Sequence, residues 1–273
     1  MKGPLILSLM IAAAVTPGAQ ASGVKPSLEV VVLGSGGPRA FGRAGSSYIV
    51  LIDGKPRILL DAGPGAFVRI GELNIDLGQV DIVLLTHLHI DHSGDLAAFF
   101  NARALTSDGP IKYRVFGPDD LAIELNTGVT KIVDENGLIV EEIVTHHGDC
   151  PSVAYRITYH DKSVVFSGDM DASAVSNLVR LATSADLLVF NCAVLDPPDS
   201  PSQLYELHTP PKKIGETAKE SGVGSLLLSH TAPDVEESKN AVMKSIHTFF
   251  TGPVEFATDR MRVQITHRPQ GAH

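Results

Sequence analysis

The sequence predicts an α/β (α+β) protein in which mixed β-sheets pack between layers of helices. Two observations support this fold class. Short runs of leucine and β-branched residues are interleaved with segments that suit helices, but strand and helix do not alternate strictly. With 44% hydrophobic and 19% charged residues, the 273-residue chain also has an ordinary globular composition, which excludes a disordered chain, a collagen and a small disulfide scaffold.

The strands are predicted from short apolar runs, several of which are separated by glycine-rich turns such as residues 34–38 and 53–56. The predicted strands are 28–33, 47–52, 57–61, 81–85, 112–116, 138–145, 153–159, 163–167, 186–191 and 224–229. The predicted helices are 95–106, 172–182, 211–220 and 235–249. In the last helix, Val235, Val242 and Ile246 recur on one face near the helical period of about 3.6 residues.

The first 21 residues are predicted to be a secretory signal peptide. Lys2 provides a basic start, residues 5–15 are apolar apart from one serine, and residues 19–21 form an A-x-A cleavage pattern. A bilayer span needs about 20 apolar residues, so this shorter run favours a removable signal, with a short N-terminal anchor as the alternative. The mature chain, residues 22–273, shows no repeat or linker. It is predicted to be one domain, periplasmic or secreted, without a stable membrane anchor.

Charge and cysteine content restrict the expected partners. Removal of the signal peptide, which contains one lysine, takes the formal net charge from −9 to −10. An acidic surface repels phosphate backbones, and no run of five or more basic residues offsets this, so no nucleic-acid partner is expected. Cys150 and Cys192 are too few for a disulfide framework but can pair in an oxidising compartment, and we predict a bridge between them.

The most informative segment is residues 86–95 (THLHIDHSGD), which follows an apolar strand and precedes a predicted helix. In an extended loop, His87 and His89 can point the same way and share one metal, while Asp91 and His92 can serve a second metal nearby. Burial of four such side chains removes their hydration, a cost that divalent cations offset. Imidazole and carboxylate donors suit zinc or a neighbouring first-row metal. The alternative is a solvated polar turn with coincidental histidines.

This pattern, T-H-x-H-x-D-H after an apolar strand, resembles the metallo-β-lactamase superfamily, and the similarity extends over about residues 28–261. The resemblance implies a four-layer αββα sandwich, in which two mixed β-sheets are flanked by helices. It also implies two divalent metal ions, expected to be zinc, with six terminal ligands and one bridging aspartate. His87 and His89 match the first-metal pair of the family, and Asp91 and His92 match the second-metal pair.

Three further ligands are assigned from the same resemblance. His147 is the candidate third histidine, because its surroundings match the H-G-x-x-P…Y-R arrangement of the ribonuclease Z and arylsulfatase-like branch; His146 is the alternative. Asp169, in an S-G-D that follows an apolar strand, matches the bridging carboxylate, whereas Asp171 is expected to be solvated or to cap the next helix. His230, at the end of another apolar strand, matches the last ligand.

Four residues around the ligands, and the ligand Asp91 itself, are candidates for supporting, catalytic or substrate-binding roles. Asp61 matches a family aspartate that supports the ligands from behind, with an aspartate in a simple turn as the alternative. Asp91 is expected to accept the proton of the nucleophile. His208 matches in place the H-S-T loop of the ribonuclease Z branch and is a candidate proton donor to the leaving group, or else a surface-loop histidine. Arg39 and Arg43 are candidates to hold an anionic substrate, or else solvated surface arginines.

The cluster predicts a metal-dependent hydrolase. Two metals about 3.5–4 Å apart can bind a water between them and lower its pKa toward about 7, which provides hydroxide at neutral pH. In an exported member of this branch, we expect the hydroxide to cleave phosphodiester or sulfate esters of small molecules. The expected partner is therefore a small anionic ester. Members of the family are often dimers, so the resemblance also allows a homodimer.

Ribonuclease Z-like endonuclease activity is an alternative, and the sequence is closest to that branch at residues 34–38. Three features favour a small ester instead. Residues 155–170 contain no long insert for a tRNA-gripping arm, residues 191–194 (NCAV) replace the family's H-E-a-T, and the protein is predicted to be exported. Lactonase or β-lactamase activity is a further alternative, although Ala172 stands where lactonases carry a tyrosine. The alternative outside enzymes is a non-catalytic metal-binding protein.

Overall fold

The computed structural model describes residues 26–39, 41–106, 113–118 and 128–267. The predicted signal peptide, residues 1–21, lies outside the described residues and stays a prediction. None of the helices in the described part of the chain combines the length and apolar character that a membrane span requires.

The first of two β-sheets contains six strands in the order β13-β1-β2-β3-β4-β5. Its strands are β1 (Leu28–Gly34), β2 (Ser47–Ile52), β3 (Lys55–Ala62), β4 (Ile82–Leu84), β5 (Arg114–Phe116) and β13 (Arg262–Gln264). The pairs that join β13, β1, β2 and β3 are antiparallel, whereas β4 and β5 continue the sheet in parallel with β3. Because β3 and β4 run in the same direction, Asp61 near the end of β3 lies beside the segment that follows β4.

The second sheet contains seven strands in the order β12-β11-β10-β9-β8-β7-β6. Its strands are β6 (Thr130–Glu135), β7 (Leu138–His147), β8 (Cys150–Tyr159), β9 (Lys162–Phe166), β10 (Leu187–Asn191), β11 (Ser225–Ser229) and β12 (Val254–Phe256). Strands β6 to β9 form an antiparallel meander, whereas β9 to β12 are parallel. The carboxyl ends of β9, β10 and β11 therefore meet at one edge of this sheet.

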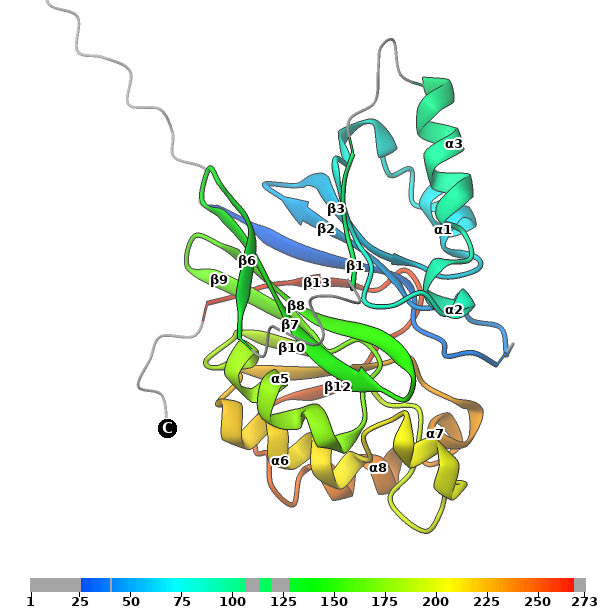
Figure 1. The fold of residues 1–273 in the computed structure, drawn as a ribbon, viewed down its shortest axis with the longest axis vertical. Coiled ribbons are helices and arrows are strands. Elements are labelled where there is room, and N and C mark those ends of the chain that lie inside the picture. The colour runs from blue at the N-terminus through cyan, green and yellow to red at the C-terminus, as the bar shows by residue number, and fades with distance from the viewer. Residues whose placement is uncertain (1–25, 40, 107–112, 119–127, 268–273) are drawn as a thin grey trace, which may run out of the picture.

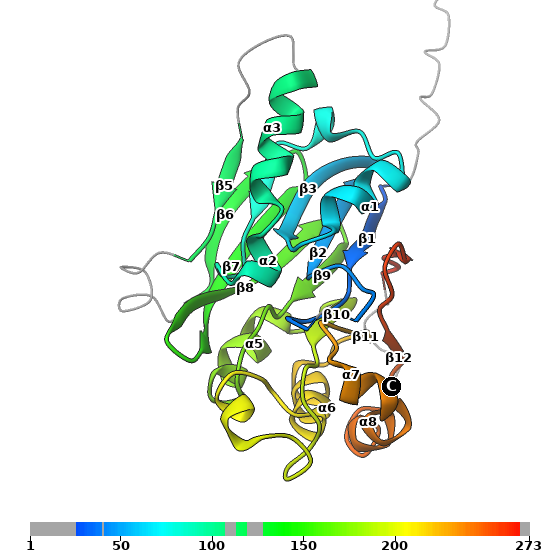
Figure 2. The same ribbon diagram turned by 90° about the vertical axis from the view of Figure 1, so that its right-hand side faces the viewer.

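Helices cover the outer face of each sheet. The α-helices of the described residues are α1 (Ala66–Glu72), α2 (Ile90–Ser93), α3 (Leu96–Thr106), α5 (Val175–Ala182), α6 (Pro211–Ser221), α7 (Pro233–Glu237) and α8 (Lys239–Ile246). The short 3-10 helices are η1 (Leu77–Gln79), η2 (Ala172–Ala174) and η3 (Ser202–Glu206). Figure 1 shows α1 and α3 beside the first sheet and α5, α6 and α8 beside the second, and in Figure 2 the strands lie between these two groups.

Three buried apolar clusters separate the four layers of helices and sheets. One cluster lies between the sheets and contains Tyr48, Tyr155 and Phe166. The second joins the second sheet to α5, α6 and α8, and the third joins the first sheet to α1 and α3. In β1, Val30 belongs to the cluster between the sheets and Val31 to the cluster under the helices, because successive side chains of a strand point to opposite faces. Burial on both faces explains the continuous apolar runs of the sequence, and the predicted αββα sandwich is confirmed.

Some observed elements differ from the predicted ones. The helix predicted over residues 235–249 is divided at Ser238 into α7 and α8. Val235, Val242 and Ile246 all belong to the same buried cluster, so the apolar period continues across the break and conceals it. The elements that the prediction omits are β6, β12, β13, α1 and the short α2. Strands β12 and β13 have only three residues each and are partly exposed at sheet edges, so their apolar pattern is too short to detect.

The two cysteines are free thiols, so the predicted bridge between Cys150 and Cys192 is wrong. Cys150 begins β8, and its Sγ atom lies 3.8 Å from the carbonyl oxygen of Pro151. Cys192 follows β10 and is fully buried in the cluster between the second sheet and its helices. The two thiols therefore lie in different environments, one in a strand turn and the other in the core.

Candidate metal centre

The predicted ligands come from strand ends of both sheets. The segment after β4 carries His87 and continues into α2, which holds the later ligands of the same motif. In the second sheet, β7 ends at His147, Asp169 follows β9, and His230 follows β11. Residues that are far apart in the sequence therefore reach the same edge of the sandwich.

The structure brings all seven predicted ligands into two groups, and within each group the ligand atoms lie within 4.8 Å of one another. The first group is His87, His89 and His147, and the second group is Asp91, His92, Asp169 and His230. All of these side chains are buried except that of His89. The structure thus places the predicted residues together, and their function as metal ligands stays a prediction.

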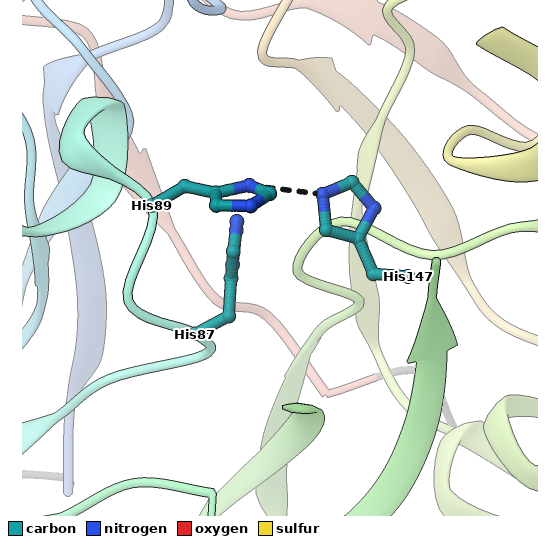
Figure 3. Close-up of side chains that lie close together, drawn as sticks. All are labelled: His87, His89 and His147. Atoms are coloured by element: carbon teal, nitrogen blue, oxygen red, sulfur yellow. Dashed lines mark hydrogen bonds between the residues drawn. The ribbon is translucent and has the colours of Figure 1, made fainter. Parts of the chain in front are cut away.

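Figure 3 shows the first group, in which His87 and His89 from the segment after β4 approach His147 from the end of β7. His147 Nε2 lies 3.2 Å from His89 Nδ1, and the ring centroids of His87 and His147 are 4.9 Å apart. Burial lowers the pKa of His87 to about 2 and also lowers the pKa of His147, so both rings are neutral at neutral pH. Neutral imidazole is the form that binds a metal ion.

Asp169 lies at the meeting point of the two groups. Its Oδ2 atom is 3.4 to 4.0 Å from a ring nitrogen of each of five histidines, namely His230, His92, His147, His208 and His87. Burial raises the pKa of Asp169, but the nearby charge of His230 and other histidines outweighs burial and holds this pKa well below its usual value. Asp169 is therefore a buried, ionised carboxylate among nitrogen donors, which is the setting of a carboxylate shared between two cations.

Unpartnered nitrogen atoms indicate that the two groups suit cations. His87 Nε2 and His92 Nε2 are buried and have no hydrogen-bond partner among the described residues. They lie 4.0 Å and 3.6 Å from Asp169 Oδ2. A buried polar atom without a partner costs about 1–3 kcal/mol, so a divalent cation bound among these atoms would stabilise the protein. The donor set of imidazoles and carboxylates fits such a cation.

Asp61 supports the second group from behind. Its Oδ2 atom lies 2.8 Å from His92 Nδ1, and its two oxygens accept hydrogen bonds from the backbone N–H and the hydroxyl of Thr86. Burial lowers the pKa of His92, but the carboxylates of Asp61 and Asp169 outweigh burial and hold this pKa well above its usual value. With Nδ1 engaged by Asp61, the Nε2 atom of His92 is turned toward Asp169.

The glycine-rich turn detected in the sequence packs against His230. A Cβ atom at Gly37 would lie 3.1 Å from His230 Cε1, and the Gly37 N–H donates a hydrogen bond to the carbonyl oxygen of Thr231. His230 Nε2 lies 3.0 Å from Asp91 Oδ2. Burial raises the pKa of Asp91, but His230 and the charge of His92 hold it at about 2, so Asp91 is a carboxylate at neutral pH.

His208 is buried and belongs to the centre, so the alternative of a surface-loop histidine is wrong. Its unpartnered Nδ1 atom lies 3.9 Å from Asp169 Oδ2, and its ligand atom lies within 4.8 Å of those of His147 and Asp169. His147 Nδ1 donates a 2.8 Å hydrogen bond to the carbonyl oxygen of Leu207, which ties the loop of His208 to the first group. Burial lowers the pKa of His208 to about 4.

Comparison with known proteins assigns this chain to a family. A sequence model of the metallo-beta-lactamase superfamily matches residues 41–214, more than half of the chain. The chain belongs to this superfamily. The predicted family and the predicted enzyme class, a metal-dependent hydrolase of the metallo-beta-lactamase superfamily, are therefore confirmed.

Similar members of the superfamily align along nearly the whole chain. Ribonuclease Z from Mycolicibacterium gilvum (strain PYR-GCK) is 28% identical over 87% of this chain and 96% of its own length. Ribonuclease Z from Mycobacterium avium (strain 104) is 27% identical over 87% and 98%. Among solved structures, the metallo-beta-lactamase fold protein YhfI from Bacillus subtilis has a TM-score of 0.70 at 22% identity and covers 87% of this chain and 99% of its own. The short form of human tRNase Z has a TM-score of 0.67 at 18% identity, with the same coverage.

These relatives overturn two predictions for this superfamily member. The predicted hydrolysis of small phosphodiester or sulfate esters is wrong, and so is the exclusion of nucleic acid in favour of a small anionic ester, because the similar proteins are named Ribonuclease Z. The predicted export stays a prediction. Net charge describes the whole surface, whereas contact with a nucleic acid depends on local groups at the site. The altered H-E-a-T segment and the missing insert leave the two ligand groups of the superfamily intact.

Arg43 is engaged by other groups of the protein, and its predicted substrate-binding role stays a prediction. One guanidinium nitrogen donates hydrogen bonds to the Ser35 hydroxyl and the carbonyl oxygen of Ala257, and the other bonds to Glu236 at 2.7 Å. The guanidinium group therefore ties the glycine-rich turn to α7 and to the residue that follows β12. Arg39 is exposed in the loop that follows this turn, and its predicted role stays a prediction.

His147, and not the alternative His146, points into the centre. Neighbouring residues of a strand face opposite ways, and the His146 side chain is 57% exposed with its Nδ1 atom 2.6 Å from Asp171. Asp171 also accepts hydrogen bonds from the backbone N–H and the hydroxyl of Ser173, so it caps η2 as the sequence suggested. Neither residue belongs to the two ligand groups.

Sequence reasoning missed Asn191 as a member of the site. Its side-chain Nδ2 donates a 2.7 Å hydrogen bond to Asp169 Oδ1. The sequence contained a signal, because Asn191 ends an apolar strand at the position of the family's H-E-a-T segment. The substitution was interpreted only as a loss of that segment.

Proposed function

We propose that this chain is a ribonuclease Z-like endonuclease that hydrolyses a phosphodiester bond of an RNA substrate at the two ligand groups. The observation that carries the proposal is the joint presence of both ligand groups and a buried His208 facing Asp169. These features lie in a chain that aligns with proteins named ribonuclease Z over 87% of its length.

The two ligand groups would hold two divalent cations. The residues that would hold them are His87, His89 and His147 for one cation, Asp91, His92 and His230 for the other, and Asp169 for both. We propose zinc, because imidazole and carboxylate are ligands that zinc commonly takes in hydrolases. Such cations lower the pKa of water and polarise a phosphoryl oxygen.

Asp91 is proposed to orient the attacking water and to receive its proton. The Asp91 side chain is 13% exposed, the largest exposure in the second group, so solvent reaches it. Its Oδ2 atom lies beside His230 Nε2, so one side of the carboxylate is fixed. With a pKa of about 2, Asp91 is ionised at neutral pH, so before the reaction it is free to accept a hydrogen bond from the water.

His208 is proposed to donate a proton to the leaving oxygen of the RNA. Its Nδ1 atom is buried without a hydrogen-bond partner among the described residues, and it points to the region where Asp169 meets the two groups. Hydrolysis of a phosphodiester leaves an alkoxide, which is a poor leaving group unless an acid protonates it. A bound phosphate would also add negative charge beside His208 and favour its protonated form.

Cleavage of RNA by the purified mature chain tests this proposal. The substrates are a tRNA precursor with a 3′ extension and an unstructured RNA of the same length, with zinc or manganese supplied. We expect endonucleolytic products that disappear with a chelator and fall by about 10²-fold or more in Asp91→Ala and His208→Ala. His160→Ala, which changes an exposed histidine on the β8–β9 turn, is the matched control. Absence of RNA cleavage by metal-loaded protein that retains its fold would contradict the proposal.

Export of the protein is a separate proposal. We propose that residues 1–21 direct export, because they combine a basic start, an apolar run and an A-x-A pattern. Fractionation of cells that express the full chain with a C-terminal tag is the test. A shortened product outside the cytoplasm is expected, and an uncleaved cytoplasmic product would contradict export without affecting the proposed RNA cleavage.

A further inference from the structure

The two oxygens of Asp169 have different environments. All five ring nitrogens that approach this carboxylate do so at Oδ2, at distances of 3.4 to 4.0 Å. The Oδ1 atom instead accepts a 2.7 Å hydrogen bond from Nδ2 of Asn191. Asn191 and Asp169 are both buried, with exposed fractions of 5% and 3%. One oxygen is therefore held by the protein, and the other faces the two ligand groups.

The fold places Asn191 beside Asp169 through the parallel pairing of β9 and β10. In this pair Phe166 lies opposite Val189, so the residues that follow each strand emerge side by side. The backbone N–H of Asn191 donates to the hydroxyl of Ser167, which fixes the end of β10 against the turn. Gly168 has a φ of 58°, in the left-handed region, and this turn directs Asp169 back across the strand ends.

We propose that Asn191 is a positioning residue for the metal centre. It holds Oδ1 of Asp169 so that Oδ2 alone is presented to both ligand groups. An amide suits this task because it donates a hydrogen bond without adding charge to a site that already contains several ionisable groups. Asn191 thus supplies an uncharged donor at the position that resembles the family's H-E-a-T segment. The inference concerns the metal centre on which the proposed function also rests, but it can be measured without RNA.

Metal binding by Asn191 variants tests the inference. Asn191→Ala removes the donor and the side-chain volume, whereas Asn191→Asp keeps the shape and replaces the donor by an acceptor. We expect both variants to bind zinc about 10–100-fold more weakly than the unchanged chain in a competition titration with a chromogenic chelator. The absorption spectrum of the cobalt-loaded protein is expected to change, because a freed Asp169 binds in a different geometry.

Two further variants separate positioning from packing. Asn191→Ser is the smallest side chain that keeps a donor, and it is expected to bind zinc more tightly than Asn191→Ala. Asn177→Ala is the matched control, because Asn177 donates a similar 2.9 Å hydrogen bond, to the carbonyl oxygen of Val144, away from the ligand groups. This control is expected to bind zinc as the unchanged chain does. Circular dichroism of the metal-free variants verifies that each one is folded.

Several outcomes would overturn the inference. Zinc affinity within about twofold of the unchanged chain in both Asn191→Ala and Asn191→Asp would show that the hydrogen bond does not position Asp169. Normal affinity in Asn191→Asp with weak binding in Asn191→Ala would assign Asn191 a packing role only. Equal binding by the serine and alanine variants would have the same meaning. If the unchanged chain binds two zinc ions but cleaves no RNA, the proposed function fails while these binding results still stand.

Discussion

The two sheets contribute to the metal centre in different ways. The first sheet supplies four ligands from one continuous segment, residues 87–92, and Asp61 on the neighbouring strand contacts this segment at His92 and at the adjoining Thr86. The second sheet supplies His147, Asp169 and His230 from three separate strand ends. The contribution of the first sheet is therefore local in sequence, whereas that of the second sheet exists only after the chain has folded.

The supports of the second-sheet ligands also differ from one another. The ligands His147 and Asp169 are held by a backbone carbonyl and by the amide of Asn191, and the ring of His230 is packed by Gly37. A change in one support of the second sheet is therefore expected to disturb one ligand. A change at Asp61 is expected to disturb more of the first-sheet segment, because Asp61 contacts both Thr86 before it and His92 at its end. We therefore expect substitutions of these supports to weaken zinc binding to different extents.

The largest effect is expected from Asp169→Ala, because Asp169 is shared by both ligand groups. The substitution leaves His230 and the other histidines without their common anion. We expect bound zinc to fall from about two ions per chain to below one, and RNA cleavage to fall roughly a thousandfold, since the cations supply several kcal/mol. Elemental analysis and single-turnover cleavage measure these effects. Asp171→Ala, which removes a neighbouring aspartate outside both groups, is the control. Retention of two tightly bound ions in Asp169→Ala would show that the groups are independent.

A smaller effect is expected from Asp61→Asn, which tests whether one support holds the whole segment of the first sheet. The asparagine keeps the shape but weakens the charged contact with His92 and the hydrogen bonds from Thr86. Zinc affinity is expected to fall about 10–100-fold in a competition titration. Asp53→Asn is the matched control, because Asp53 also has a positive φ and accepts hydrogen bonds elsewhere on the same sheet. If Asp61→Asn binds zinc as Asp53→Asn does, the charge of Asp61 has no role in the site.

The ligands of the first sheet are adjacent in the sequence and those of the second sheet are not, which explains how much of the site could be predicted. The motif from His87 to His92 is readable because its ligands are close together and follow an apolar strand. His147, Asp169 and His230 carry no mutual spacing that identifies them, and they were assigned only through the family pattern. Asn191 was missed because its contact with Asp169 depends on the register of two parallel strands, which no local pattern reports.

Burial and length decide which strands could be predicted from the sequence. The strands of the sheet centres, such as β1, β2 and β10, were predicted because they are buried on both faces and read as apolar runs. The edge strands β12 and β13 were missed because three partly exposed residues make no pattern. The ion pair of Arg43 with Glu236 was not predicted, because a guanidinium group beside a glycine-rich loop suits an anion and an internal ion pair equally well.

A modest effect is expected from Gly37→Ala, which disturbs one support of the second sheet. The added Cβ atom would lie 3.1 Å from His230 Cε1, so the ring or the turn has to move by a few tenths of an ångström. Such crowding typically costs about 1 kcal/mol, which corresponds to roughly fivefold weaker binding at the group that contains His230. A zinc titration that resolves the two sites measures it. Gly71→Ala is the control, because a Cβ atom at Gly71 meets nothing within 4 Å. Equal weakening at both sites would contradict the idea that second-sheet supports act one ligand at a time.

The last effect acts on stability and leaves both ligand groups unchanged, and it concerns the thiols at two strand ends of the second sheet. Burial raises the pKa of Cys192 from its ordinary 9.0 to about 12, whereas Cys150 is partly exposed. The unfolded thiol ionises above pH 9 and the folded one does not, so the stabilising contribution of Cys192 is complete below pH 9 and is lost as pH rises toward 12. Relative to Cys192→Ala, the unchanged chain is expected to lose about 2 kcal/mol of unfolding free energy between pH 8 and 10.5, measured by urea denaturation.

Alkylation provides a second measurement of the difference between the buried Cys192 and the partly exposed Cys150. At pH 8 iodoacetamide is expected to modify Cys150 in the native protein and Cys192 only after denaturation, because the reactive thiolate is suppressed by burial. Cys150→Ala is the control, since it removes the native reaction while leaving the pH dependence of stability unchanged. Two unreactive cysteines in denatured, unreduced protein would show that a disulfide forms after all. Native modification of Cys192 at the rate of Cys150 would show that the end of β10 opens readily, and that the strand which carries Asn191 is less firmly fixed than its hydrogen bonds indicate.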